Sequence, residues 1–180
     1  LGVAYGKLRR YSEALEAFKY AIVIRPDYAK AYYSLGVAYG KLHRYPEAID
    51  AFKKAIAVKP DYAEVYYSLG IAYGKLHRYP EAIDAFKKAI AVKPDYAEAH
   101  NNLGVTYLKS GMYTTALEAF DQALMIKPDY AKALLNLGVA HLVMGERSKA
   151  SENIGYLKSL VADGRGDDPP LSPYWISHYE

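Results

Sequence analysis

The stretch AYGKLHRYPEAIDAFKKAIAVKPDYAE at residues 38–64 occurs again without change at residues 72–98, which is 34 positions later. The same period extends beyond the copied stretch, because PDYA recurs at residues 26–29, 60–63, 94–97 and 128–131. A fixed period of this length is typical of proteins built from stacked structural repeats. The chain is therefore predicted to be an array of copies of one unit.

Each unit is predicted to form two α-helices separated by a short turn. Pro46 falls in the first turn of the second helix, where its missing N–H costs nothing. Pro60 should end the pair, and Asp61 is expected to cap the next helix together with Glu64 in a capping box. Apolar residues recur at helical spacing in both halves of the unit: Tyr32, Leu35, Tyr39 and Leu42, then Ala48, Phe52, Ala55 and Ile56.

A lone pair of short helices buries too little apolar surface to fold by itself, so neighbouring pairs must stack on one another. Gly36 and Ala48 are small and are placed where the two helices of a pair would approach closely. The same small residues recur in the following units, and the close approach is expected in each of them.

These recurring positions resemble the signature of the tetratricopeptide repeat: Tyr32, Leu35, Gly36, Tyr39, Ala48, Phe52, Ala55 and Pro60. The resemblance implies an all-α fold, a right-handed α-solenoid of antiparallel helix pairs with a 34-residue period. Two units depart from it, since His100 and Leu134 stand at the position of Tyr32. The resemblance divides an array at residues 1–163 into a truncated repeat (1–28), three full repeats (29–62, 63–96 and 97–130) and a divergent last repeat (131–163).

Both ends of the chain invite an interpretation. Leu1 aligns with Leu35, so we interpret the chain as a piece of a longer array. The last helix is expected at residues 148–162, with Gly164 as its C-terminal cap and an apolar face, Ile154, Leu157, Leu160 and Val161, that no further repeat covers. Residues 164–180 are rich in proline and aromatic residues, and we expect this tail to dock as a cap.

Composition and motifs argue against several classes of function. The formal net charge of +3 is small and spread along the chain, which speaks against nucleic acid as a partner. No apolar run approaches the roughly 20 residues of a membrane span, and the absence of cysteine excludes thiolate chemistry. The histidines lack the spacing of a metal or catalytic motif, so no enzyme activity, cofactor or metal site is predicted.

The resemblance further implies that the first helices of the pairs line a groove that binds a peptide segment of a partner protein. Tyr33 and Tyr67 would serve as amphipathic anchors, although such rings also pack between repeats. Asn102 and Asn136 would pair with an extended peptide backbone. The family's contact positions are carried over to Lys30, Tyr33, Ser34, Val37, Lys41, Glu64, Tyr67, Ser68, Ile71, Lys75, Asn101, Asn102, Val105, Lys109, Lys132, Asn136 and Val139.

Three alternatives remain open for the function. The two-carboxylate clamp of chaperone adaptors is disfavoured, because it needs lysine and asparagine where this chain has Tyr33 and Val37. The chain is alternatively a self-associating scaffold, that is, a homo-oligomer. The third alternative is that the chain is the targeting region of a larger enzyme such as a glycosyltransferase.

Overall fold

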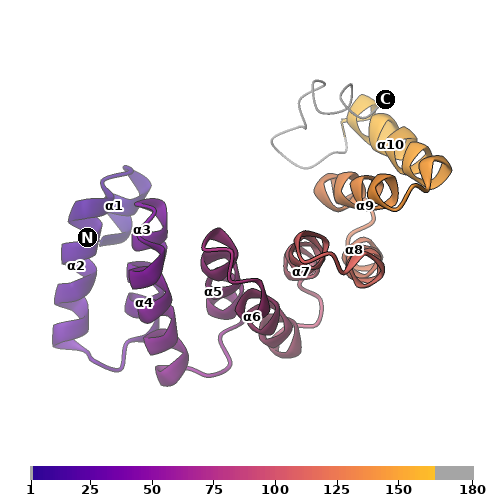
Figure 1. Cartoon of the computed structure of the whole chain (residues 1–180). Coiled ribbons are helices and arrows are strands. Elements are labelled where there is room, and N and C mark those ends of the chain that lie inside the picture. Colours follow the sequence, from indigo (N-terminus) through magenta and orange to yellow (C-terminus); the bar gives the residue numbers. More distant parts are fainter. Residues whose placement is uncertain (1, 165–180) are drawn as a thin grey trace. The chain divides into compact units, whose positions relative to one another are not determined.

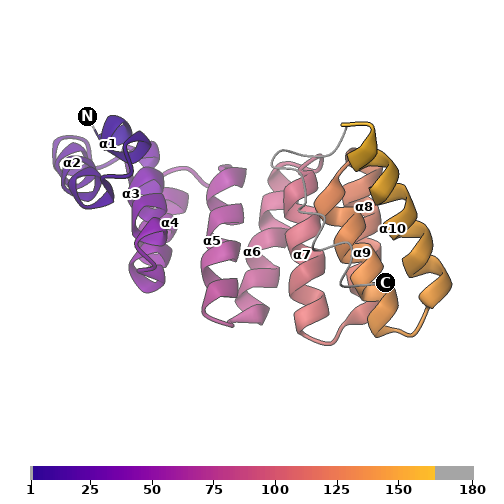
Figure 2. The same cartoon turned by 90° about the horizontal axis from the view of Figure 1, so that it is seen from above.

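The structure, a computed structural model, describes residues 2–164 and contains ten α-helices and no strand within them. The chain divides into two compact units, residues 1–94 (unit 1) and residues 95–180 (unit 2). Each unit consists of consecutive helix pairs that lie side by side (Figures 1 and 2). The all-α fold of helix pairs is confirmed, whereas the predicted docking of the tail lies outside the described residues. Unit 1 contains α1 (Gly2–Lys7), α2 (Tyr11–Ile24), α3 (Ala29–Lys41), α4 (Tyr45–Val58), α5 (Ala63–Lys75) and α6 (Tyr79–Val92), and unit 2 contains α7 (Ala97–Lys109), α8 (Tyr113–Ile126), α9 (Ala131–Val143) and α10 (Arg147–Ala162).

The helices of a pair meet where a glycine of the first faces a phenylalanine of the second. A Cβ placed on Gly36 would lie 2.5 Å from the Phe52 ring, far inside van der Waals contact. Gly70 and Gly104 would meet Phe86 and Phe120 at 2.7 and 2.6 Å. The close approach predicted from the small residues is therefore confirmed, and it recurs with the sequence period.

Neighbouring pairs within a unit are held together by buried aliphatic side chains. In unit 1, Leu15 of α2 packs with Leu35 of α3 and Ala51 of α4. In unit 2, Leu157 and Leu160 of α10 are fully buried and pack with Leu134 of α9. The prediction that the apolar face of α10 stays uncovered was wrong for three of its four residues, because Leu157 and Leu160 pack on α9 and Ile154, which is 8% exposed, faces Gly138 of α9.

The first helices begin without the predicted capping boxes. The N-cap of α5 is Tyr62, and no side chain bonds to the free amides of that helix end. The Tyr62 ring packs 5.4 Å from the Tyr33 ring, and the Lys59 ammonium lies 5.1 Å from its centroid. The side chain at the cap position is therefore engaged in ring contacts, and Asp61 lies one residue outside the cap position.

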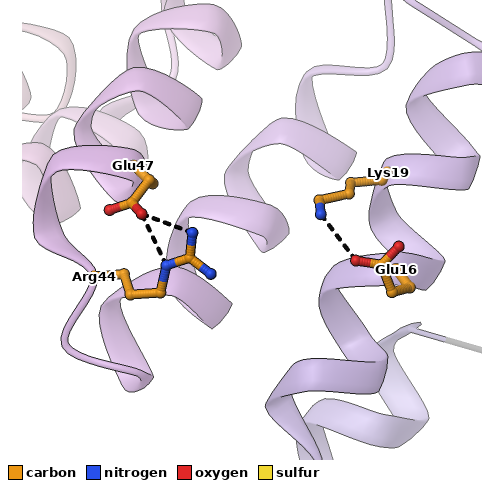
Figure 3. A network of polar contacts seen from close by, with 4 residues as sticks. All are labelled: Glu16, Lys19, Arg44 and Glu47. Atoms are coloured by element: carbon orange, nitrogen blue, oxygen red, sulfur yellow. Dashed lines mark hydrogen bonds and ion pairs between the residues drawn. The ribbon is translucent and has the colours of Figure 1, made fainter.

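The turn between the helices of a pair carries a recurring ion pair. Arg44 donates to Glu47 from Nε and Nη2 at 2.8 and 2.7 Å (Figure 3). The hydrogen bond from Arg44 lowers the pKa of the Glu47 carboxyl, and the guanidinium lies 4.7 Å from the Tyr39 ring centroid. Exposed pairs of this kind contribute little energy, like the Lys19–Glu16 pair on α2 in the same view. The contact of the Arg44 guanidinium with the Tyr39 ring adds a cation–π interaction to this turn.

The same turn contains a residue in the left-handed backbone region. His43 and His77 have φ of 58° and 57°, and the equivalent residues of the next two pairs are Gly111 and Gly145, with φ of 75° and 80°. The His43 ring nitrogen Nδ1 lies 2.9 Å from the hydroxyl of Tyr45. The two histidines therefore adopt a conformation that glycine adopts without steric cost.

We expect Gly36→Ala to lower the stability of the chain by about 1–3 kcal/mol, since the new methyl group overpacks a buried phenylalanine. Thermal unfolding followed by circular dichroism measures the effect. Gly40→Ala in the same helix is the matched control, because its Cβ would meet no atom of the described residues within 4 Å. The control should stabilise the helix, and a Gly36→Ala variant as stable as the control would contradict the close packing.

At position 43 we expect His43→Gly to be more stable than His43→Ala by about 1 kcal/mol, because both lose the ring contact but only alanine keeps the left-handed strain. Urea unfolding of the two variants gives the difference. The same pair of substitutions at Lys54, an exposed residue in the interior of α4, should give the opposite sign, since alanine is the better helix former. Equal stability of the two variants at position 43 would contradict the assigned backbone conformation.

Candidate functional site

All seventeen predicted contact residues lie on the first helices of their pairs. Ten of them are on α3 and α5 of unit 1, and seven are on α7 and α9 of unit 2. The helices therefore present these side chains as two separate sets, one in each unit.

In unit 1 the structure contains a cleft of about 280 Å³ between α1, α2 and α3. Four predicted residues, Tyr33, Ser34, Val37 and Lys41, form its α3 side. The opposite side comes from residues that were not predicted from the sequence. The 34-residue period places them one repeat before Gly36, Gly40, Tyr45, Ala48 and Phe52. The residues of this opposite side are Gly2 and Gly6 of α1 and Tyr11, Ala14 and Phe18 of α2, and Ala38 of α3 completes the lining.

The tyrosines that were expected to anchor a partner are partly engaged within their own unit. The Tyr33 ring lies 6.0 Å from the Phe52 ring, and the Tyr67 ring lies 5.9 Å from that of Phe86. Both tyrosines remain half-buried, so each ring is supported by its own pair and keeps part of its surface accessible. A ring held in this way loses little conformational freedom when it contacts a ligand.

The remaining unit 1 residues are mostly open to solvent. Ile71 is 37% exposed, Ser68 is half-buried, and Lys30, Glu64, Lys41 and Lys75 are exposed. Lys41 and Lys75 end α3 and α5, where a cation interacts favourably with the helix dipole. The rim at this end of the unit 1 face is therefore basic.

In unit 2 the asparagines bind each other. Asn136 of α9 donates from Nδ2 to Oδ1 of Asn101 on α7 at 2.9 Å, and Asn101 is only 4% exposed. Asn101 occupies the repeat position of Tyr33 and Tyr67 in unit 1, whose half-buried rings contact Phe52 and Phe86. The amide of Asn101 therefore links α7 to α9, whereas the sequence had suggested that it contacts a partner. The other unit 2 residues are half-buried (Asn102, Val105 and Val139) or exposed (Lys109 and Lys132).

One ionisable pair, His141 and Glu146, was not predicted from the sequence, where its members stand five residues apart. His141 is buried at the end of α9, and its Nδ1 lies 2.6 Å from Oε2 of Glu146. The hydrogen bond from His141, and a second one from Lys149, lower the pKa of the Glu146 carboxyl. His141 and Glu146 occupy the positions at which Arg44 covers Tyr39, so an acid–histidine pair replaces a cation–π contact in this turn.

Within residues 2–164 no group of three or more histidine, aspartate or glutamate side chains is placed to hold a metal ion. Among the helices described, none has the length and apolar character needed to cross a membrane. The candidate site therefore consists of the cleft of unit 1 and the accessible faces of the first helices, which carry apolar, aromatic and basic side chains.

Comparison with protein families identifies the repeat. Models described as TPR repeat and tetratricopeptide repeat match residues 2–43 and 76–111, residues 29–62 and 97–130, and residues 51–84, and together they span residues 2–130. No curated protein sequence matches the chain at the significance required.

Solved structures share the fold over most of the chain. A crystal structure of MamA is 27% identical and superposes with a TM-score of 0.86, covering 91% of this chain and 96% of that one. YrrB, described as a TPR protein with an unusual peptide-binding site, is 24% identical with a TM-score of 0.78, covering 98% and 87%. PilF of Pseudomonas aeruginosa is 23% identical with a TM-score of 0.80, covering 93% and 75%. At such identities YrrB and PilF show the fold alone.

The repeated glycine–phenylalanine contact, the proline-terminated pairs and the continuous family match lead to one conclusion: the chain belongs to the tetratricopeptide repeat family, whose fold serves in protein-interaction modules.

Proposed function

We propose that this chain is a non-catalytic module that binds a peptide segment of a partner protein along the first helices of its pairs. The observation that carries the proposal is the cleft of unit 1, which gathers four of the predicted contact residues with complementary residues of α1 and α2. YrrB, as a fold relative described with a peptide-binding site, supports a peptide as the kind of ligand.

The lining of the cleft suits one apolar side chain of a peptide. Gly6 and Ala14 leave room, and Phe18 and Val37 supply an apolar floor. The hydroxyls of Ser34, Tyr11 and Tyr33 are donors and acceptors that suit a peptide backbone beside that side chain. Pockets for side chains combined with polar contacts to the main chain are the usual means of recognising extended peptides.

The same chemistry recurs 34 residues later within unit 1. Ser68, Ile71 and Lys75 of α5 repeat the positions of Ser34, Val37 and Lys41 of α3. A peptide that contacts both helices would therefore meet an apolar residue, a hydroxyl and a lysine twice. Acidic side chains in the peptide would be favoured next to the two lysines.

We expect Ile71→Glu to weaken the binding of peptides by about tenfold, or 1.4 kcal/mol, because it places a charge on the apolar part of the face. The probe is a set of peptides selected on the wild-type chain from a displayed random library, and the affinities are measured by isothermal titration. Val37→Glu, inside the cleft, should act in the same direction.

Val92→Glu is the matched control for this test, since Val92 is 39% exposed against 37% for Ile71 but lies at the end of the second helix α6. The control should bind the selected peptides like wild type. The proposal that the first helices bind the peptide is contradicted if Ile71→Glu and Val92→Glu lose the same affinity. It is also contradicted if Val37→Glu and Ile71→Glu both bind with wild-type affinity.

A further inference from the structure

The second helix of the last described pair differs from the other second helices at the positions that pack on a following pair. Leu15 and Ile22 of α2 pack against α3 and α4, and Leu124 of α8 packs against α9 and α10. The positions equivalent to Leu15 and Leu124 in α10 are Ser151 and Lys158. The outer side of α10 has therefore lost the apolar side chains by which one pair stacks on the next.

A cleft of about 610 Å³ occupies this side of α9 and α10. Arg147 and Lys158 bring two positive charges to its lining. Arg147 stands at the position held by Tyr11, Tyr45, Tyr79 and Tyr113 in the earlier pairs. The cleft is thus basic where the other second helices are aromatic and aliphatic. Its lining is Leu142, Arg147, Ala150, Ser151, Ile154, Gly155 and Lys158.

Gly155 gives this cleft additional room. It lies in the middle of α10, and a Cβ placed on it would meet no atom of the described residues within 4 Å. Glycine inside a helix costs about 1 kcal/mol relative to alanine, and the other pairs have charged residues here, Lys53, Lys87 and Asp121. The exposed backbone at Gly155 lets a flat group approach the helix closely.

We propose that this basic cleft binds residues 165–180 of the same chain. The segment carries three acidic residues, Asp167, Asp168 and Glu180, against one arginine, so its charge is complementary to that of Arg147 and Lys158. It also carries Trp175, whose flat ring suits the open backbone of Gly155 and the half-buried apolar side chain of Leu142. Ion pairing and aromatic packing together give the segment two kinds of contact with the cleft.

The segment is long enough to reach the cleft within one molecule. α10 has 16 residues and is about 24 Å long. The 16 residues of the segment span up to about 50 Å when extended, so they can return along the whole helix. Tethering to the end of α10 gives the segment a millimolar effective concentration at the cleft, which a second copy of the chain in dilute solution does not reach.

Trp175 is the single tryptophan of the chain, so its fluorescence reports directly on this contact. In the full 180-residue chain we expect blue-shifted emission and protection from acrylamide. Reversing both cleft charges, with Arg147→Glu and Lys158→Glu together, should raise the quenching constant several-fold and shift the emission to the red. High salt should act in the same direction on the wild-type chain, since it screens the ion pairs.

Lys53→Glu with Lys54→Glu is the matched control, because it makes the same change of net charge on the exposed surface of α4. Circular dichroism checks that each variant is folded, and the salt titration tests the proposal even if the double variant in α10 unfolds. The proposal is overturned if Trp175 is as accessible in the wild-type chain as in urea, or if neither charge reversal nor salt changes its accessibility. Protection that appears only with dimers at high concentration would assign the cleft to a second copy and overturn it equally.

Discussion

The contact between a glycine and a phenylalanine inside each helix pair determines how the rest of this protein is built. Gly36, Gly70 and Gly104 let the second helix come so close that the phenylalanine ring lies directly on the backbone of the first. With one side of the first helix closed in this way, its other residues are left for neighbouring pairs and for solvent. In the last pair Gly138 faces Ile154 instead, and a Cβ placed on Gly138 would lie 3.6 Å from the nearest side-chain atom, so the same contact is looser there.

The near-identity of the repeats separates structural positions from variable ones. Alanine, glycine and phenylalanine at the contacts inside the pairs hardly change, whereas the residues around them differ between the units. Tyr33 and Tyr67 pack on a phenylalanine, but Asn101 at the same position binds Asn136. Arg44 covers Tyr39, but Glu146 binds His141 at the equivalent positions. The two units therefore differ in a few side chains on a backbone that stays constant.

Much of the fold could be predicted from the sequence because period, proline and glycine act locally. Pro60 marked the end of a pair, and Gly36 marked the close approach, since each has a steric consequence that does not depend on distant residues. The caps were not predictable in this way: the N-cap of α5 is Tyr62, which packs on Tyr33, and local spacing does not show such a tertiary contact. Spacing also could not show that Leu157 and Leu160 face α9. For the site, the residues of α3 were identified, but the opposite wall of the cleft from α1 and α2 was not.

Hydrogen–deuterium exchange of the chain with and without a selected peptide shows whether the first helices are the binding surface. We expect the peptide to slow exchange in α3 and α5, at residues 29–41 and 63–75, and to leave the second helices α4 and α6 unchanged. Added protection confined to residues 45–58 and 79–92 would contradict it, since the peptide would then bind the opposite side of the pairs.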